Sequence, residues 1–165
     1  MPIPLLIPAL LLLAAPGVPD ALELTPGVYV LEGAPTAATY ASLRSAKISY
    51  VINLRRDGEP GFDPGEESAA LGALGVNYIR LAIGKAPARA DLDLFRSILR
   101  DLPKNARILV HCGDGNRASA AVCAFLVLDR GMKADTALAE ARTSGLRLPE
   151  TERALRRYLG QEGGV

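Results

Sequence analysis

The segment ILVHCGDGNRAS, residues 108–119, holds the residues of this sequence that are best suited to catalysis. Cys112 is followed by a glycine-containing turn and then by Arg117, which opens an apolar stretch. Backbone N–H groups of a turn that enters a helix converge on one point and can bind an oxyanion there. Gly113 and Gly115 allow the backbone angles that such a turn needs, and the planar guanidinium of Arg117 can hold two oxygens. The pattern predicts an anion site with a cysteine at its base.

The same features favour the thiolate form of Cys112, because the N–H groups, the helix dipole and Arg117 all stabilise negative charge at the turn. A thiolate beneath a bound phosphate is a nucleophile placed in line with the phosphorus. A cysteine and an arginine at this spacing are, by themselves, more often a buried cysteine in a turn and a solvated arginine. The strand-terminal His111-Cys112 pair and the apolar helix that follows make the pattern more specific.

The small counts of metal-ligating residues exclude several other chemistries. His111 is the one histidine, which excludes metal sites that need two or three imidazoles. Two cysteines exclude a four-thiolate zinc or iron–sulfur site within one chain, and they allow one disulfide at most. We therefore expect no metal and no cofactor. The net charge of +1, from 19 basic and 18 acidic residues, argues against a nucleic-acid partner held by bulk charge.

The chain of 165 residues has the size of one domain, and its apolar pattern alternates between strands and helices. Strands are predicted at 28–31, 50–54, 76–81 and 107–110, and helices at 36–47, 64–74, 91–102, 117–130, 135–144 and 149–159. This alternation predicts an α/β fold whose sheet is covered by helices on both faces. The stretch ASAAVCAFLVL is apolar on nearly all sides, so we expect a buried central helix with Cys123 in the core.

The motif His111-Cys112-x-x-Gly115-x-Arg117 resembles the signature loop of the cysteine-dependent, dual-specificity-type protein phosphatases. Residues 22–159 are similar in order to the phosphatase-like domains of a bacterial branch, the beta-lactamase hydrolase-like proteins. The segments that carry the resemblance are LTPGVYVLEGAPT, VINLRRDGEP, GVNYIRL and VHCGDGNRASA.

The resemblance implies a three-layer cysteine-phosphatase fold, with a short, mostly parallel central sheet flanked by helices. It also implies a phosphocysteine intermediate and no metal. Cys112 would be the nucleophile, and His111 would orient the loop rather than act as a base. The phosphate would be bound by the residues of the loop, which are Gly113, Asp114, Gly115, Asn116 and Arg117.

Two departures from the family concern the loop itself. The four residues between Cys112 and Arg117 make it one residue shorter than the usual phosphatase loop. Rhodanese-type sulfurtransferases, whose cysteine carries a persulfide, have a loop of similar length. Ala118 replaces the hydroxyl residue that normally follows the arginine, which leaves Ser119 as a supporting hydroxyl. A carboxylate aimed at the bound anion would repel it, so we expect Asp114 to point outward.

A third departure concerns the general acid, which in the family is an aspartate in the loop that precedes the cysteine. Residues 80–90 contain no acidic residue. Asp57 and Asp91 are the candidates for this role. Asp57, together with Glu59, follows a predicted strand at the sheet edge where α/β proteins bind ligands. Asp91 could instead charge a helix N-terminus.

These observations favour a phosphatase that hydrolyses phosphate monoesters, of the phosphotyrosine or dual-specificity type, through a Cys112 phosphocysteine. A rhodanese-like sulfurtransferase that uses a Cys112 persulfide is the first alternative. The second is a non-catalytic module that binds anions or phosphoproteins. The partner is accordingly a phosphorylated or a sulfur-carrying substrate, and the sequence leaves the oligomeric state open.

The first fifteen residues, MPIPLLIPALLLLAA, are apolar and uncharged. The run is short for a membrane span and is interrupted by Pro8, whereas small residues follow near a possible cleavage point. We predict a signal peptide over 1–21 and a catalytic domain over 22–165. The protein is then exported, to the bacterial periplasm, with no stable membrane span after leader removal. The leader lacks a basic start, and an uncleaved membrane-proximal anchor is the alternative.

Overall fold

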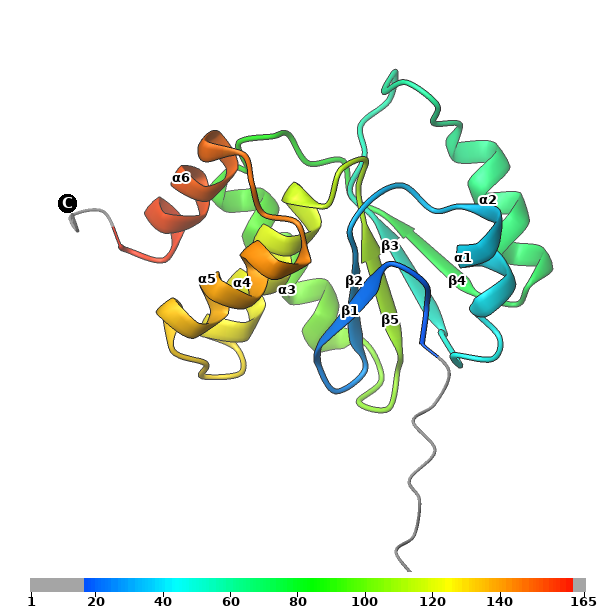
Figure 1. The fold of residues 1–165 in the computed structure, drawn as a ribbon, viewed down its shortest axis with the longest axis horizontal. Coiled ribbons are helices and arrows are strands. Elements are labelled where there is room, and N and C mark those ends of the chain that lie inside the picture. Colours follow the sequence, from blue (N-terminus) through cyan, green and yellow to red (C-terminus); the bar gives the residue numbers. More distant parts are fainter. Residues whose placement is uncertain (1–16, 162–165) are drawn as a thin grey trace, which may run out of the picture.

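A computed structural model describes residues 17–161, so most of the predicted signal peptide lies outside the described residues. A single sheet forms the middle of the molecule, with strand order β1-β2-β5-β3-β4 (Figure 1). Its strands are β1 (Ala21–Thr25), β2 (Val28–Leu31), β3 (Tyr50–Asn53), β4 (Asn77–Arg80) and β5 (Ile108–His111). β1 is antiparallel to β2, and every other neighbouring pair is parallel. The predicted short, mostly parallel sheet is confirmed.

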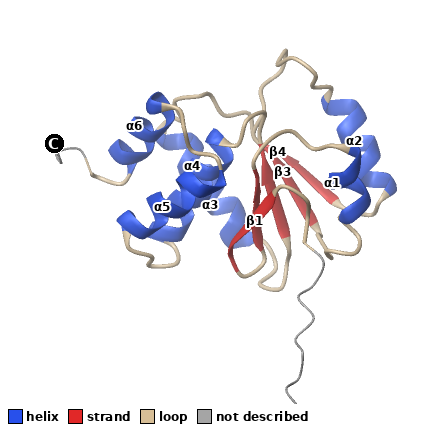
Figure 2. Cartoon of the chain, in the orientation of Figure 1, coloured by secondary structure: helices blue, strands red, loops and turns tan. Residues whose placement is uncertain are grey.

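Helices cover both faces of this sheet, as the alternation of predicted elements requires. The helices are α1 (Ala37–Ser42), α2 (Pro64–Ala73), α3 (Arg89–Asp101), α4 (Asn116–Leu128), α5 (Ala134–Ser144) and α6 (Pro149–Tyr158). Figure 2 shows α1 and α2 on one side of the strands and α3 to α6 on the other. The three-layer arrangement of the predicted fold is therefore present.

The strands divide their side chains between two apolar cores, one on each face. Val28 and Val30 of β2 belong to the core beneath α3 to α6. Tyr29 and Leu31 belong to the core beneath α1 and α2. This alternation follows from the two-residue repeat of a strand, and β3 and β5 repeat it. Because both faces are buried, the register of each strand is strongly specified.

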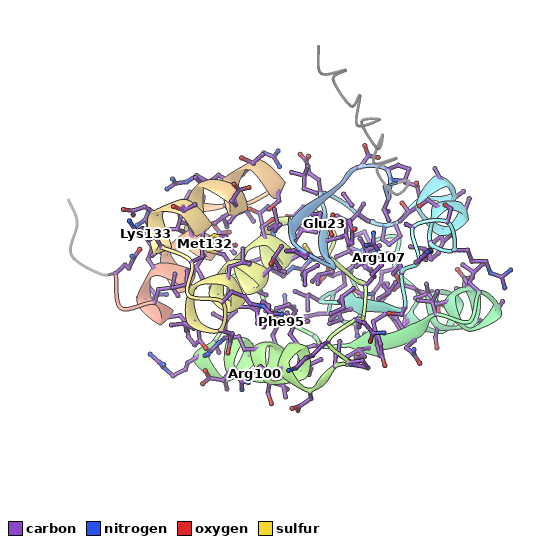
Figure 3. All side chains as sticks on the ribbon, turned by 90° about the horizontal axis from the view of Figure 1, so that it is seen from below. Glu23, Phe95, Arg100, Arg107, Met132 and Lys133 are labelled. Carbon is purple, nitrogen blue, oxygen red and sulfur yellow. The ribbon has the colours of Figure 1, made fainter. Side chains whose placement is uncertain are left out.

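α4 is the central helix that the apolar run predicts. All its residues from Asn116 to Leu126 are buried, and it packs against α3, α5 and α6. Phe95 of α3 is fully buried in the same core, and Figure 3 shows it among the side chains of the interior. Cys123 is a core residue, as expected, and burial raises the pKa of its thiol to about 12.

Two elements differ from the sequence prediction. The helix predicted at 36–47 ends at Ser42, and turns follow. The hydroxyls of Ser42 and Ser45 donate to the backbone carbonyls of Thr39 and Ser42, and such bonds compete with continued helix. β1 was not predicted. It is a short edge strand whose alternation of apolar and polar residues extends over only four residues, from Leu22 to Thr25.

None of the helices within residues 17–161 is long and apolar enough to cross a membrane.

Candidate active site

The parallel strands β3, β4 and β5 end together at one edge of the sheet, the upper edge in Figure 1. Cys112 directly follows β5 and is fully buried. Leu54 follows β3, and its backbone N–H donates to the carbonyl of His111, while its own carbonyl accepts from the N–H of Ile83 beyond β4. Hydrogen bonds thus join the three strand ends next to Cys112. This is the edge at which open α/β sheets bind ligands.

The loop after Cys112 turns into α4 through Gly115, the residue that caps the helix. Gly115 has a φ of +82°, in the left-handed region that favours glycine. A Cβ atom on Gly115 would lie 3.0 Å from the carbonyl oxygen of Glu32. The side chain of Asn116 accepts hydrogen bonds from the backbone N–H groups of Arg147 and Leu148, at 2.6 and 2.7 Å. The loop is therefore packed from both sides by other segments.

Arg117, in the first turn of α4, is buried, and both terminal nitrogens of its guanidinium group donate hydrogen bonds. Nη1 and Nη2 donate to the two carboxylate oxygens of Glu59, at 2.5 and 2.8 Å. Nη1 also donates to the carbonyl oxygen of Ile83, at 3.1 Å. The bonds to Glu59 raise the pKa of Arg117 against the opposing effect of burial, and a negative charge on Cys112 raises it further. Cys112 and Arg117 lie close together, as predicted. The guanidinium group of Arg117 binds the two carboxylate oxygens of Glu59.

Glu59 comes from the loop between β3 and α2, and the pKa of its carboxyl group is lowered. The hydrogen bonds from Arg117 lower the pKa of Glu59 to about 2, despite partial burial, with help from the backbone N–H of Arg56 and the charge of Arg55. Glu59 is therefore a carboxylate at neutral pH and has no proton to give. The sequence places Glu59 at this edge of the sheet but does not identify it as the partner of Arg117.

Asp114 is expected from the sequence to point away from the anion site, and this prediction is wrong for its Oδ1 atom, which points inward. The residue is exposed, but its Oδ1 lies 3.5 Å from Sγ of Cys112 and accepts a hydrogen bond from the N–H of Asn116 at 3.1 Å. An aspartate just before a helix commonly bonds to a backbone N–H two residues on, and this bond draws the carboxylate inward.

His111 is fully buried, and its ring contacts the backbone of Cys112. Its Nδ1 is 3.3 Å from the carbonyl oxygen of Cys112, and its Nε2 is 2.8 Å from Oε1 of Glu67. Glu67, on α2, also accepts from the side chains of Asn53 and Tyr78. Burial alone would raise the pKa of Glu67, but the contacts with His111 and the bonds from Tyr78 and Asn53 outweigh it, and the pKa is lowered.

The sequence gives little sign of Glu67 as part of the site, since a glutamate in the first turn of a helix is ordinarily a surface residue. The sheet register supplies the reason for its place. Asn53 of β3 and His111 of β5 are direct neighbours in the sheet. Both side chains meet Glu67, so they point to the face that α2 covers.

Three other predicted site residues are engaged elsewhere. Asp57 is exposed and pairs with Arg80 at 2.6 Å. Asp91 accepts a hydrogen bond from the backbone N–H of Ala88 at the start of α3, at 3.0 Å, which is the helix-terminal role that its position suggested. The buried hydroxyl of Ser119 accepts from Ser144 of α5, at 2.9 Å.

Residues 17–161 contain no group of three or more His, Cys, Asp and Glu side chains arranged to hold a metal ion. The chemistry that this site offers comes from a buried thiol, the guanidinium group of Arg117 and the start of α4.

Comparison with solved structures supports the fold. A DUF442 protein from Shewanella putrefaciens CN-32 superposes with a TM-score of 0.71 at 20% identity, over 90% of this chain and 94% of that one. TpbA from P. aeruginosa superposes with a TM-score of 0.69 at 17% identity, over 87% of this chain and 91% of TpbA. At these identities the likeness concerns the fold.

Comparison of sequences identifies the family. A beta-lactamase hydrolase-like protein of Xylella fastidiosa (strain Temecula1) is 28% identical over 135 residues, which are 79% of this chain and 31% of that protein. The protein of the same name from Agrobacterium fabrum is 31% identical over 91 residues, which are 53% of this chain and 21% of that protein. The chain thus spans less than a third of the length of either relative. Residues 20–155 match the family described as DSP-PTPase phosphatase fused to NAD+ kinase, and this chain belongs to that family of cysteine-dependent phosphatases.

Proposed function

We propose that this protein hydrolyses phosphate monoesters with Cys112 as the nucleophile. The thiolate attacks phosphorus, an S–P bond forms, and the ester P–O bond breaks with its electron pair leaving on the alcohol or phenol oxygen. Water then attacks the phosphocysteine, the S–P bond breaks, and inorganic phosphate leaves with the thiolate restored. Each half-reaction transfers one phosphoryl group and changes no oxidation state.

The observation that carries this proposal is the pairing of buried Cys112 with the oxygen-binding fork of Arg117 across one tight loop. The fork holds the two oxygens of a carboxylate in the free protein, and two phosphate oxygens present a similar pair of acceptors. Arg117 and the amides at the start of α4 would stabilise the charge that develops on the phosphoryl oxygens in the transition state. His111, held by Glu67, would fix the position of the Cys112 backbone.

Hydrolysis of p-nitrophenyl phosphate tests the proposal. The wild type should release nitrophenol, and Cys112→Ser should reduce the rate by at least about 100-fold, because a serine hydroxyl is a far weaker nucleophile than a thiolate. Cys123→Ala, which removes the other thiol, is the matched control and should retain activity. Release by the wild type no faster than by Cys112→Ser would exclude the phosphatase function.

The short loop and the lack of an acidic residue in 80–90 favour one alternative, sulfur transfer through a Cys112 persulfide. The same variants should therefore be assayed for thiosulfate-to-cyanide transfer. Cys112-dependent thiocyanate production without nitrophenol release would select the sulfurtransferase. Silence in both assays, with phosphate binding retained, would leave a binding module.

A further inference from the structure

A second arginine stands beside the proposed anion site. Arg55 follows β3, and its Nε lies 3.5 Å from Oε2 of Glu59, the carboxylate that Arg117 grips. All three groups meet over Gly113, the first residue of the loop. A Cβ atom on Gly113 would lie 3.5 Å from Oε2 of Glu59, 3.6 Å from Nη2 of Arg117 and 3.8 Å from Nε of Arg55. Two guanidinium groups therefore share one carboxylate directly above the loop.

The burial of Arg55 is unusual for a side chain with an unused donor. The residue is only 6% exposed. Its Nη2 donates to the carbonyl oxygen of Pro60 at 2.6 Å, and its guanidinium group lies over the ring of Phe62, 4.8 Å from the centroid. These contacts fix the orientation of the guanidinium group. Its Nε is nevertheless buried without a hydrogen-bond acceptor among the described residues, although Glu59 is within ion-pair distance. Buried donors normally have a partner, so this one calls for an explanation.

We propose that Arg55 is a second anion-binding residue of the site, and that Glu59 occupies the place of two substrate oxygens until phosphate displaces it. The inference rests on the proposed function in one respect, since it takes the loop above Cys112 as the phosphate site. A phosphate dianion suits two guanidinium groups better than the single negative charge of Glu59 does. It would take over the fork of Arg117 and give the Nε of Arg55 the acceptor that it lacks.

Glu59 has a route out of the site. Its side chain is 21% exposed and so already borders solvent. It belongs to the connection between β3 and α2, where Gly58 and Gly61 both have positive φ. The cost of breaking its bonds to Arg117 is offset by the bonds that phosphate makes in its place.

Calorimetric titration with inorganic phosphate tests this inference without turnover, on a Cys112→Ser background. Glu59→Gln should tighten phosphate binding about tenfold, because it removes a competing charge. Arg55→Met should weaken binding about tenfold, as loss of a charged hydrogen bond does, and by more when Glu59→Gln is also present. Arg56→Met, at the exposed neighbour in the same loop, is the matched control for a general loss of positive charge and should leave affinity within about twofold.

The opposite results would overturn the inference. If Glu59→Gln weakens phosphate binding, Glu59 positions Arg117 instead of competing for it. If Arg55→Met and Arg56→Met have equal effects, or Arg55→Met alters only the thermal unfolding temperature, Arg55 is not part of the anion site. Arg55→Lys, which keeps the charge, guards against a loop that is merely disturbed, and it should bind phosphate better than Arg55→Met.

These outcomes are distinguishable from failure of the proposed function. If the wild type releases nitrophenol but Glu59→Gln binds phosphate more weakly, the phosphatase stands and this inference fails. If the wild type releases no nitrophenol but Arg55→Met weakens phosphate binding and Glu59→Gln tightens it, this inference stands and the phosphatase function fails.

Discussion

Glu67 connects the interior of the protein to Cys112, the proposed nucleophile. It receives hydrogen bonds from Asn53 and Tyr78 and touches His111, whose ring in turn contacts the carbonyl oxygen of Cys112. A buried carboxylate is tolerated only when its oxygens are satisfied, and here they are. The network fixes the ring of His111 and with it the end of β5, so Glu67 acts on the cysteine through another residue rather than directly.

The charge of Glu59 should appear in the pH dependence of stability. Its pKa is lowered to about 2 in the folded protein, chiefly by the hydrogen bonds from Arg117, from an ordinary value of 4.5. A lowered pKa contributes stability that is fully present above the ordinary value and is lost as the pH falls toward the folded value. Glu59→Gln should therefore reduce the free energy of unfolding by about 1–3 kcal/mol at pH 7.

The difference between Glu59→Gln and the wild type should shrink as the pH falls from 4.5 toward 2, and chemical denaturation across this range measures it. Asp57→Asn is the control. It removes a carboxylate from the same loop, but that side chain is 80% exposed and should contribute little at any pH. A difference for Glu59→Gln that is equally large at pH 2.5 and pH 7 would show that its charge is not the cause. Taken with tighter phosphate binding by the same variant, the expected result would mean that Glu59 trades affinity for stability.

At the scale of single residues, the sequence predicts the reactive residues of the site better than it predicts the residues that hold them in place. Cys112 and Arg117 lie on one short loop, so local spacing alone brings them together. Glu59 and Glu67 reach the site from a loop and a helix that are distant in sequence. The sequence places Glu59 at the right edge of the sheet but not against Arg117, and only the sheet register explains the place of Glu67. The inward turn of Asp114 depends on a backbone bond that competes with charge repulsion, and composition does not decide between the two.

At the scale of the elements, the site depends on the loop before α4. Its two glycines, Gly113 and Gly115, have different roles. Gly115 has a positive φ, and a Cβ atom there would crowd the backbone of Glu32. Gly113 has neither restriction, and a Cβ atom would meet its neighbours at ordinary contact distances. That Cβ atom would, however, lie where we expect the phosphate oxygens to bind. Gly115 is thus required by the backbone and Gly113 by the ligand.

Replacing each glycine by alanine should separate these tasks. Gly115→Ala should destabilise the protein by about 1–3 kcal/mol, because it combines a strained backbone with a close contact. Gly113→Ala should leave the unfolding free energy nearly unchanged but reduce phosphate affinity. Denaturant unfolding and phosphate titration of the two variants provide the measurement, each variant serving as control for the other. Equal stability of both variants, or unchanged phosphate binding by Gly113→Ala, would contradict this division.

The elements themselves follow from the sequence wherever an apolar repeat or a turn residue marks them. α2 begins at Pro64 after the Asp63 cap and is followed by a turn at Gly75, as the helix signals predict. β1 and the end of α1 escape prediction for local reasons. β1 is stabilised by its pairing with β2, and the alternation within its own five residues is too short to predict a strand. The early end of α1 reflects serine hydroxyls that bond to the backbone.

At the scale of the whole molecule, the fold brings the ends of three strands together. The segments that follow these strands supply the residues of the site. The connection after β5 supplies Cys112 and leads to Arg117 in the first turn of α4, and the connection after β3 supplies Arg55 and Glu59. The connection after β4 supplies a carbonyl, that of Ile83, to hold Arg117. Residues 80–90, which include this last connection, contain no acidic residue. The position from which this family's general acid acts is therefore empty of carboxyl groups.

The carboxylates that do lie near the loop are poorly suited to protonate a leaving group. Glu59 is ionised, with a pKa lowered to about 2 by its bonds to Arg117. Oδ1 of Asp114 lies 3.5 Å from Sγ of Cys112. In an in-line displacement the leaving oxygen is on the side of phosphorus opposite the sulfur, so this carboxylate is on the wrong side. The leaving group must then depart largely unassisted.

Activity should consequently depend steeply on the acidity of the leaving group. A positioned general acid contributes about 10²- to 10⁴-fold, and kcat/KM for alkyl phosphates should fall below that for aryl phosphates by at least this additional factor. A series of substituted phenyl phosphates together with an alkyl phosphate such as phosphoserine measures the slope. Asp57→Asn and Asp91→Asn serve as controls and should not change it, because Asp57 pairs with Arg80 and Asp91 caps α3. Comparable hydrolysis of alkyl and aryl phosphates, or loss of alkyl activity in either variant, would mean that a carboxyl group reaches the leaving oxygen after all, by a movement of the loops that carry it toward the strand ends.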